Sequence, residues 1–166
     1  MRRASNVFRS SLALPMVLLA ALFAGPLGAA EASPAAERAM IEKVVTEAYV
    51  DGVHNFRDPA AMRRGFHPSF EMLSLRDGKL ARLTLDNWIE GMEARNLKEP
   101  PPKSSPDAPR ETTAKFVAVE VAGTAATCKV EIWRGGKQLF TDFLALYQFA
   151  DGWKIVSKSY RYDLRE

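Results

Sequence analysis

The chain has 166 residues, of which 47% are hydrophobic and 26% are charged, a composition typical of one ordinary globular domain. Its 23 basic and 20 acidic residues become 20 and 19 once Arg2, Arg3, Arg9 and Glu31 of the N-terminal segment are set aside. The remainder is therefore nearly neutral, and its basic residues are scattered. This charge pattern argues against a nucleic-acid partner.

The first 32 residues have the three-part pattern of a secretory signal peptide. Basic residues precede an apolar run over 12–27, and Ala30 and Ala32 are small residues suited to cleavage. We expect residues 1–32 to be removed and residues 33–166 to form the mature domain, in the periplasm or secreted. An uncleaved N-terminal anchor is the alternative. No cysteine lies near the cleavage region, so we expect no lipid anchor and no stable membrane association after cleavage.

The single cysteine, Cys128, cannot form an intramolecular disulfide. It lies in a strand-like run, where a small buried thiol is the ordinary interpretation. The sequence contains no glycine-rich phosphate loop, no Cys-x-x-Cys and no His-Glu-x-x-His motif. We therefore expect no cofactor and no metal, and a fold that is stabilised by its core alone.

Three helices are predicted in the first two thirds of the domain. Ser33 followed by Pro34 indicates a helix start, and apolar residues recur at three and four positions until about Val53. Asp58 followed by Pro59 repeats this start signal for a short helix through Arg64. Thr84 is a plausible cap for a third helix, which must end before Pro100. The five prolines in 97–110 predict a long loop.

Strands are predicted on both sides of the third helix. An Asp-Gly turn at 77–78 separates two short strand candidates, at 69–74 and 80–83. The hydrophobic period then changes to two, which predicts four strands of about ten residues at 112–121, 124–134, 137–149 and 153–162. Short glycine-containing breaks between them indicate antiparallel hairpins. The expected fold is therefore α+β, with helices that cover a long, curved, mainly antiparallel sheet and enclose a cone with a cavity.

Several stretches resemble a known superfamily. They are the Tyr49-Val50-Asp51-Gly52 run, Phe66-His67-Pro68, the segment 78–88, the run 141–146 and Asp151-Gly152-Trp153-Lys154-Ile155-Val156. Together they resemble the nuclear transport factor 2-like superfamily, and within it the bacterial, exported branch called "putative lumazine-binding". The resemblance implies three helices against a strongly bent mixed sheet, a cavity at the wide end of the cone and, frequently, a homodimer formed through the sheet. It implies little about activity, because relatives range from ketosteroid isomerase to members without known catalysis.

Two residues are weak catalytic candidates. His67 could act as an acid or base, although it could equally cap backbone groups. Asp142 lies among apolar neighbours, which would raise its pKa and suit proton abstraction. A salt bridge with Lys129, Lys154 or Lys158 is the simpler interpretation of Asp142.

The residues that we expect around the cavity are mainly aromatic or basic. Strict alternation places Lys158 and Tyr160 on the face opposite Trp153 and Ile155. The cavity candidates are His54, His67, Phe70, Trp88, Phe116, Phe143, Tyr147, Lys158 and Tyr160.

Three functions are compatible with this sequence. The first is an exported protein that binds a small apolar or aromatic molecule, without established catalysis. The second is an isomerase-, dehydratase- or cyclase-like enzyme that uses His67 or Asp142 as base. The third is a dimerisation or interaction domain. An unpaired Asp142 or His67 in the cavity would favour the enzyme, and a paired one would favour the binding protein.

Overall fold

The computed structural model describes residues 33–162. The predicted signal peptide, residues 1–32, lies outside these described residues. Within the described range, no helix combines the length and the hydropathy that a membrane span requires.

The first predicted helix is confirmed, but half of it is wound differently. It begins as α1 (Pro34–Val44) and continues directly as the π-helix η1 (Val45–Asn55). Ser33 caps α1 by accepting a hydrogen bond from the Ala36 N–H at 3.3 Å. A π-helix forms i to i+5 hydrogen bonds, so side chains five residues apart lie above one another. The apolar pattern predicted the helix, although it carried no sign of the wider winding.

The second helix, α2 (Pro59–Gly65), is also confirmed, and it packs against η1. Asp58 caps it by accepting from the Ala60 N–H at 2.9 Å. Gly65 allows the close approach, because a Cβ atom at this position would overlap the side chain of Ala48. The cap and the glycine together determine where α2 begins and ends.

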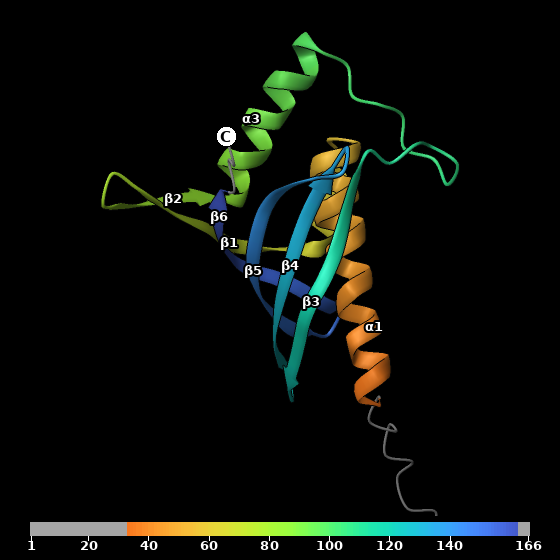
Figure 1. Ribbon diagram of the computed structural model, residues 1–166, viewed down its shortest axis with the longest axis vertical. Coiled ribbons are helices and arrows are strands. Elements are labelled where there is room, and N and C mark those ends of the chain that lie inside the picture. Colours follow the sequence, from red (N-terminus) through yellow and green to blue (C-terminus); the bar gives the residue numbers. More distant parts are fainter. Residues whose placement is uncertain (1–32, 163–166) are drawn as a thin grey trace, which may run out of the picture. The chain divides into compact units, whose positions relative to one another are not determined.

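A hairpin and the third helix follow as predicted. Strands β1 (Phe66–Arg76) and β2 (Lys79–Thr84) are antiparallel, and Asp77 and Gly78 both have positive φ in the turn. This conformation is typical of two-residue hairpin turns. Helix α3 (Leu85–Lys98) begins at Thr84, whose hydroxyl accepts from the Asn87 N–H. The hairpin and α3 project from the body of the domain in Figure 1.

The last four strands form the predicted meander. They are β3 (Thr112–Ala122), β4 (Ala125–Arg134), β5 (Lys137–Phe149) and β6 (Gly152–Tyr162). The six strands lie in the order β2-β1-β6-β5-β4-β3, and β1 and β6 form the parallel pair of this mixed sheet. The sheet is strongly curved, and α1 and η1 pack against its concave side (Figure 1). The expected α+β cone fold is confirmed.

A β-bulge in β6 corrects one prediction. Leu146 pairs with Ile155, whereas Ala145 pairs with Ser157, so Val156 is an extra residue in the ladder. An extra residue reverses which face every later side chain occupies. Lys158 therefore lies on the same buried face as Ile155, and its predicted place on the opposite face was wrong.

Candidate functional site

Three polar side chains meet inside the domain although they are far apart in the sequence. The Tyr49 hydroxyl, from η1, donates a hydrogen bond to Asp142 Oδ2 at 2.6 Å, and Lys158 Nζ donates to the same hydroxyl. Asp142 Oδ1 lies 3.0 Å from Lys158 Nζ, at ion-pair distance but without the angle of a hydrogen bond. We call Tyr49, Asp142 and Lys158 the buried trio.

Aromatic rings surround the ammonium group of the buried trio. Lys158 Nζ lies 4.4 Å from the ring centre of Tyr49 and 4.7 Å from that of Tyr160. The side chain of Lys158 is 5% exposed, and that of Asp142 has no exposed surface. Burial lowers the pKa of Lys158 and raises the pKa of Asp142, and their attraction opposes both shifts. Burial, followed by the charge of Asp142, raises the pKa of Tyr49 well above its usual value, so Tyr49 remains a neutral donor.

His54 packs directly on the buried trio. It lies five residues after Tyr49 in the π-helix, and their ring centres are 4.9 Å apart in an edge-to-face arrangement. The Nε2 atom of His54 is enclosed by protein and has no hydrogen-bond partner among the described residues. Burial, then the charges of Lys158 and Arg134, lower the pKa of His54 to about 3. His54 is therefore a neutral imidazole with unused hydrogen-bonding capacity.

A cavity of about 800 Å³ opens beside His54. The end of η1, helix α3, the loop 99–111 and the ends of β4 and β5 form its walls. Trp88 and Phe140 supply aromatic surface, and Gly91 leaves open space on the α3 wall. About half of its lining residues are polar or charged, and a cavity of this size suits a small organic molecule that carries both apolar and polar groups.

Arginines supply the charged groups of this cavity. Arg57 and Arg95 both pair with Glu99, at 3.2 and 3.3 Å. Arg134 instead donates from Nε to the Thr112 hydroxyl at 2.9 Å and from Nη2 to the His54 carbonyl at 3.3 Å. Within residues 33–162, no carboxylate lies at ion-pair distance from Arg134. Its guanidinium is thus held in place with its charge uncompensated by a direct partner.

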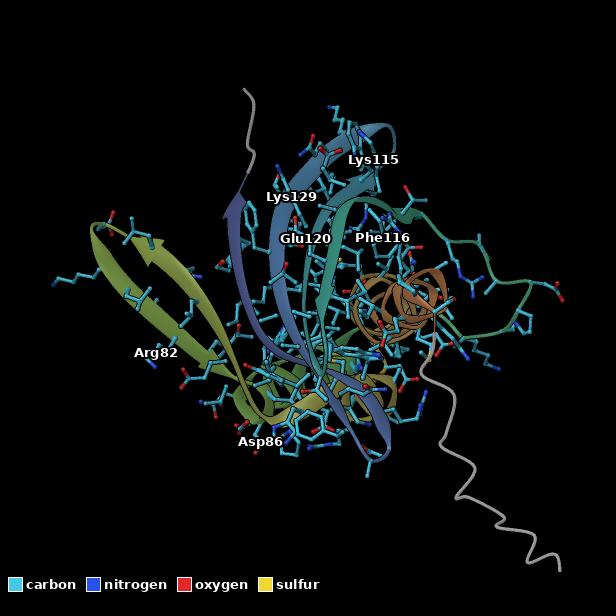
Figure 2. All side chains as sticks on the ribbon, turned by 90° about the horizontal axis from the view of Figure 1, so that it is seen from below. Arg82, Asp86, Lys115, Phe116, Glu120 and Lys129 are labelled. Atoms are coloured by element: carbon cyan, nitrogen blue, oxygen red, sulfur yellow. The ribbon has the colours of Figure 1, made fainter. Side chains whose placement is uncertain are left out.

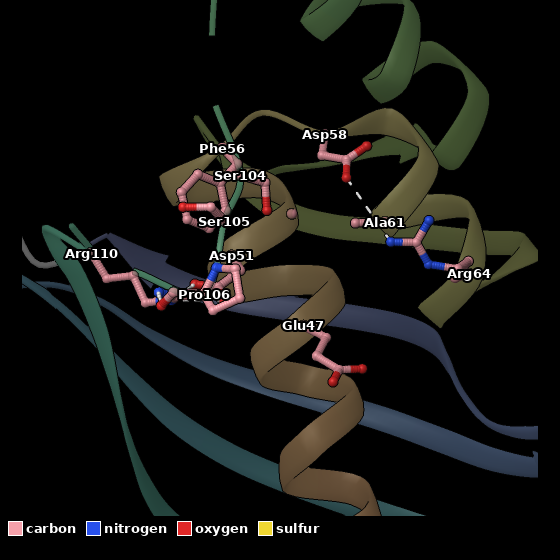
Figure 3. Close-up of a pocket in the computed structure, with 11 residues that line it drawn as sticks. Glu47, Asp51, Phe56, Asp58, Ala61, Arg64, Ser104, Ser105, Pro106 and Arg110 are labelled. Atoms are coloured by element: carbon pink, nitrogen blue, oxygen red, sulfur yellow. Dashed lines mark hydrogen bonds and ion pairs between the residues drawn. The ribbon is translucent and has the colours of Figure 1, made fainter. Parts of the chain in front are cut away.

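A second hollow, of about 460 Å³, lies between η1, α2 and the loop 99–111 (Figure 3). Asp51 and Arg110 form an ion pair there at 3.0 Å, and Arg110 also donates to the carbonyls of Pro106 and Ala108. These contacts attach the proline-rich loop to η1. Asp58, in contrast, pairs with Arg64 at 4.0 Å on the α2 side of this hollow.

The two predicted catalytic candidates are separated in the structure. Asp142 belongs to the buried trio, where its predicted ion pair with Lys158 is present. His67 lies on β1, stacks on Phe149 at 4.6 Å and accepts a hydrogen bond from the Ser69 N–H. Neither residue lines the 800 Å³ cavity. Both have partners, which is the arrangement that favours a binding protein over an enzyme.

The remaining predicted cavity residues divide among four environments. His54 and Trp88 line the cavity, whereas Phe70 is fully buried in the core and Phe116 packs against it. Phe143 and Tyr147 are 51% and 49% exposed on the outer face of the sheet, because they alternate with the buried Leu144 and Leu146. Their expected place in the cavity is thus corrected. Lys158 is in the buried trio, and the Tyr160 ring packs edge-on against Phe140.

Three residues of the buried trio and the cavity wall were not predicted from the sequence. Tyr49 was assigned only to the helix, Phe140 only to a strand face, and Arg134 only to the end of a strand. The spacing of Tyr49 and His54 would place them on different faces of an α-helix, since five residues correspond to about 140° beyond a full turn. The π-helical winding was the missing information.

No group of three or more His, Cys, Asp or Glu side chains in the part of the chain that the structure describes could hold a metal ion. The cavity instead offers imidazole, guanidinium and aromatic groups. These groups can bind and orient an organic molecule.

The fold places the chain in a known structural class. A nuclear transport factor 2-like protein of unknown function from Silicibacter pomeroyi superposes with a TM-score of 0.61 at 26% identity, over 79% of this chain and 99% of that one. Another, from Shewanella baltica, gives 0.62 at 22% identity, over 81% and 99% of the two chains. A third, from Methylobacillus flagellatus, gives 0.57 at 17% identity, over 80% and 95%. The domain therefore has the nuclear transport factor 2-like fold.

The sequence assigns the family within that class. The family model described as "Putative lumazine-binding" matches residues 36–161, almost the whole described domain. The chain belongs to this family. No curated protein sequence matches it significantly.

Proposed function

We propose that this is an exported protein that binds a small, largely apolar or aromatic molecule in the 800 Å³ cavity and does not transform it. The observation that carries the proposal is the cavity itself, which His54, Trp88 and Phe140 line, while Asp142 forms its ion pair with Lys158 away from it. The family to which the chain belongs is named for a small-molecule ligand. The basic, apolar and small-residue pattern of the N-terminus supports export to the periplasm or beyond.

The electrostatics of His54 favour binding over catalysis. A general base works best when its pKa lies near the operating pH. A pKa of about 3 makes the His54 imidazole a weak base at neutral pH, although it can still donate and accept hydrogen bonds. The alternative, an isomerase-, dehydratase- or cyclase-like enzyme, would need a base at the cavity, and Asp142 and His67 both lie outside it.

The test is native mass spectrometry of the protein purified from the periplasm of the organism that produces it. The unmodified protein is compared with a variant in which a larger side chain fills the cavity. Gly91→Phe should fill it, because the Gly91 position borders open space on α3. Ala94→Phe is the matched control, an exposed site on the same helix that does not line the cavity.

We expect a retained small molecule in the unmodified protein and in Ala94→Phe, and its loss in Gly91→Phe. Retention of the same molecule in Gly91→Phe would refute binding at this cavity. Turnover of that molecule by the purified protein would establish the enzyme instead.

We also propose that two copies of the chain associate through the outer face of the sheet. Phe143 and Tyr147 on β5 and Val117 on β3 expose large apolar side chains there. Such side chains are typical of interface cores. Analytical ultracentrifugation of Phe143→Lys should show monomers where the unmodified protein shows dimers, and a monomeric unmodified protein at micromolar concentration would contradict the proposal.

A further inference from the structure

One of the three arginines of the 800 Å³ cavity has no carboxylate partner among the described residues, and hydrogen bonds hold it in position. Arg57 and Arg95 share the carboxylate of Glu99, whereas Arg134 has no such partner in the described part of the chain. Two of its five N–H donors are used, by the Thr112 hydroxyl and the His54 carbonyl. These two bonds orient the guanidinium, and its remaining donors are free for another acceptor.

His54 is adjacent to this guanidinium and adds a second hydrogen-bonding group. A neutral imidazole has one donor and one acceptor nitrogen. The Arg134 bond to the His54 carbonyl holds the two residues together, and Lys158 lies behind the Tyr49 ring on which His54 packs. An anionic oxygen at this end of the cavity would therefore meet the Arg134 guanidinium beside the His54 ring.

Aromatic surface continues from this polar end. The Phe140 ring lies 5.9 Å from the His54 ring, and Trp88 forms part of the α3 wall. The cavity thus combines a flat apolar region with a cationic end. Two carboxylates oppose these charges: Glu99 is paired with Arg57 and Arg95, whereas Glu111 is an exposed carboxylate on the loop side of the cavity that would repel an anion.

We propose that the ligand is an aromatic or otherwise apolar small molecule with one anionic oxygen group, such as a carboxylate, bound at Arg134 and His54. This inference rests on the proposed function and specifies its ligand class. Arg134 is the specificity-determining residue, because it alone among the three cavity arginines has no carboxylate partner in residues 33–162.

The experiment compares two probes that differ in one charge, naphthalene-2-carboxylate and naphthalene-2-carboxamide. Binding to the purified protein is followed by tryptophan fluorescence, to which Trp88, Trp133 and Trp153 contribute, and by the imidazole NMR signals, which are simple because the chain has two histidines. The carboxylate should bind about tenfold more tightly, the difference expected for one good charge-assisted hydrogen bond.

Three variants identify the cause of any such difference. Arg134→Gln should weaken carboxylate binding by about tenfold and so remove most of the preference for the carboxylate, and Glu111→Gln should increase that preference. Arg82→Gln is the matched control and should keep the preference, because Arg82 lies on the β1–β2 hairpin, away from the meander (Figure 2).

The outcomes separate this inference from the function on which it rests. Equal affinity for the two probes, with His54 signals shifted by both, would overturn the anionic ligand and leave the binding function intact. A carboxylate preference that survives Arg134→Gln would also overturn it. If neither probe perturbs His54 or Trp88, the binding function fails, and the inference fails with it.

Discussion

Two neighbouring groups of polar side chains in this domain are built in opposite ways. In the buried trio, Tyr49, Asp142 and Lys158 are paired with one another through a 2.6 Å hydrogen bond, a 3.0 Å ion pair and the Lys158 to Tyr49 contact. At the cavity wall, His54 and Arg134 keep unused hydrogen-bonding capacity. The two groups are in direct contact, because the His54 ring packs on the Tyr49 ring.

The comparison shows that the buried charge of Lys158 can affect the cavity through His54, although Lys158 does not line the cavity. A buried ion pair is costly to desolvate and is weak evidence for net stability. Here the aromatic rings around Lys158 hold it under the cavity wall, where its charge contributes to keeping His54 neutral. The buried trio is therefore a support for the cavity wall, and the wall is where a ligand would bind.

The largest expected effect comes from breaking the buried trio. Lys158→Met leaves the Asp142 carboxylate buried without its cation, and removal of one member of a buried pair costs about 3 to 5 kcal/mol. Urea denaturation should show this loss, and the double variant with Asp142→Leu should recover much of it. Arg82→Met breaks an exposed ion pair with Glu71 and should cost at most about 1 kcal/mol. A similar cost for both single variants would contradict the structural role of the buried trio.

The next effect is the pH dependence that His54 imposes. Its pKa is about 3 in the folded protein against an ordinary 6.5, so the unfolded chain binds more protons between these values. This contribution to stability is fully present above pH 6.5 and is lost as the pH falls toward 3, by at most about 1.4 kcal/mol per pH unit.

Denaturation measured across this pH range should show a shallower slope in His54→Phe than in the unmodified protein. His67→Phe is the matched control, because it changes the other histidine on β1. Identical slopes in the unmodified protein and His54→Phe would show that His54 is not the buried neutral group that we describe.

A smaller effect is expected for the Tyr49 hydroxyl. Tyr49→Phe keeps the ring and removes a hydrogen bond to a charged partner, which should cost about 1.5 to 3 kcal/mol. Tyr147→Phe removes a hydroxyl on the exposed face and should be nearly neutral in the same denaturation assay. Equal stability of Tyr49→Phe and Tyr147→Phe would argue that Lys158 and Asp142 do not need the bridging hydroxyl.

The smallest effect on stability should come from the cavity wall. Arg134→Gln removes an exposed charge, so we expect a change within about 1 kcal/mol. It should nevertheless raise the pKa of His54, because Arg134 is one of the charges that lower it. An NMR titration of the His54 ring measures this shift, and an unchanged titration would disprove the electrostatic coupling of the two residues.

Local patterns were sufficient for nearly all of the architecture. Ser33, Asp58 and Thr84 cap the three helices as their positions predicted. The change of hydrophobic period after residue 111 predicted the meander, because period two places alternate side chains on opposite faces. The family resemblance added the bent sheet and the cavity.

The cavity was predicted only in part. His54 and Trp88 were assigned to it and line it, while Phe143 and Tyr147 were assigned to it and lie on the outer face. Alternation separates the two faces of a strand, but which face meets the helices depends on packing between distant segments. For the same reason Asp142 could be predicted to pair with a lysine, although three lysines were equally good candidates.

The sequence by itself determined which segments form helices and strands, because caps, turns and hydrophobic periods act over a few residues, although β1 begins at Phe66, three residues before its predicted start. Tertiary structure alone decided the site. The extra residue at Val156 reversed the face of Lys158, and the π-helix aligned Tyr49 with His54. The contacts of Tyr49 with Asp142 and Lys158 join residues 93 and 109 positions apart. Such contacts depend on register and winding across the whole fold, which no local pattern specifies.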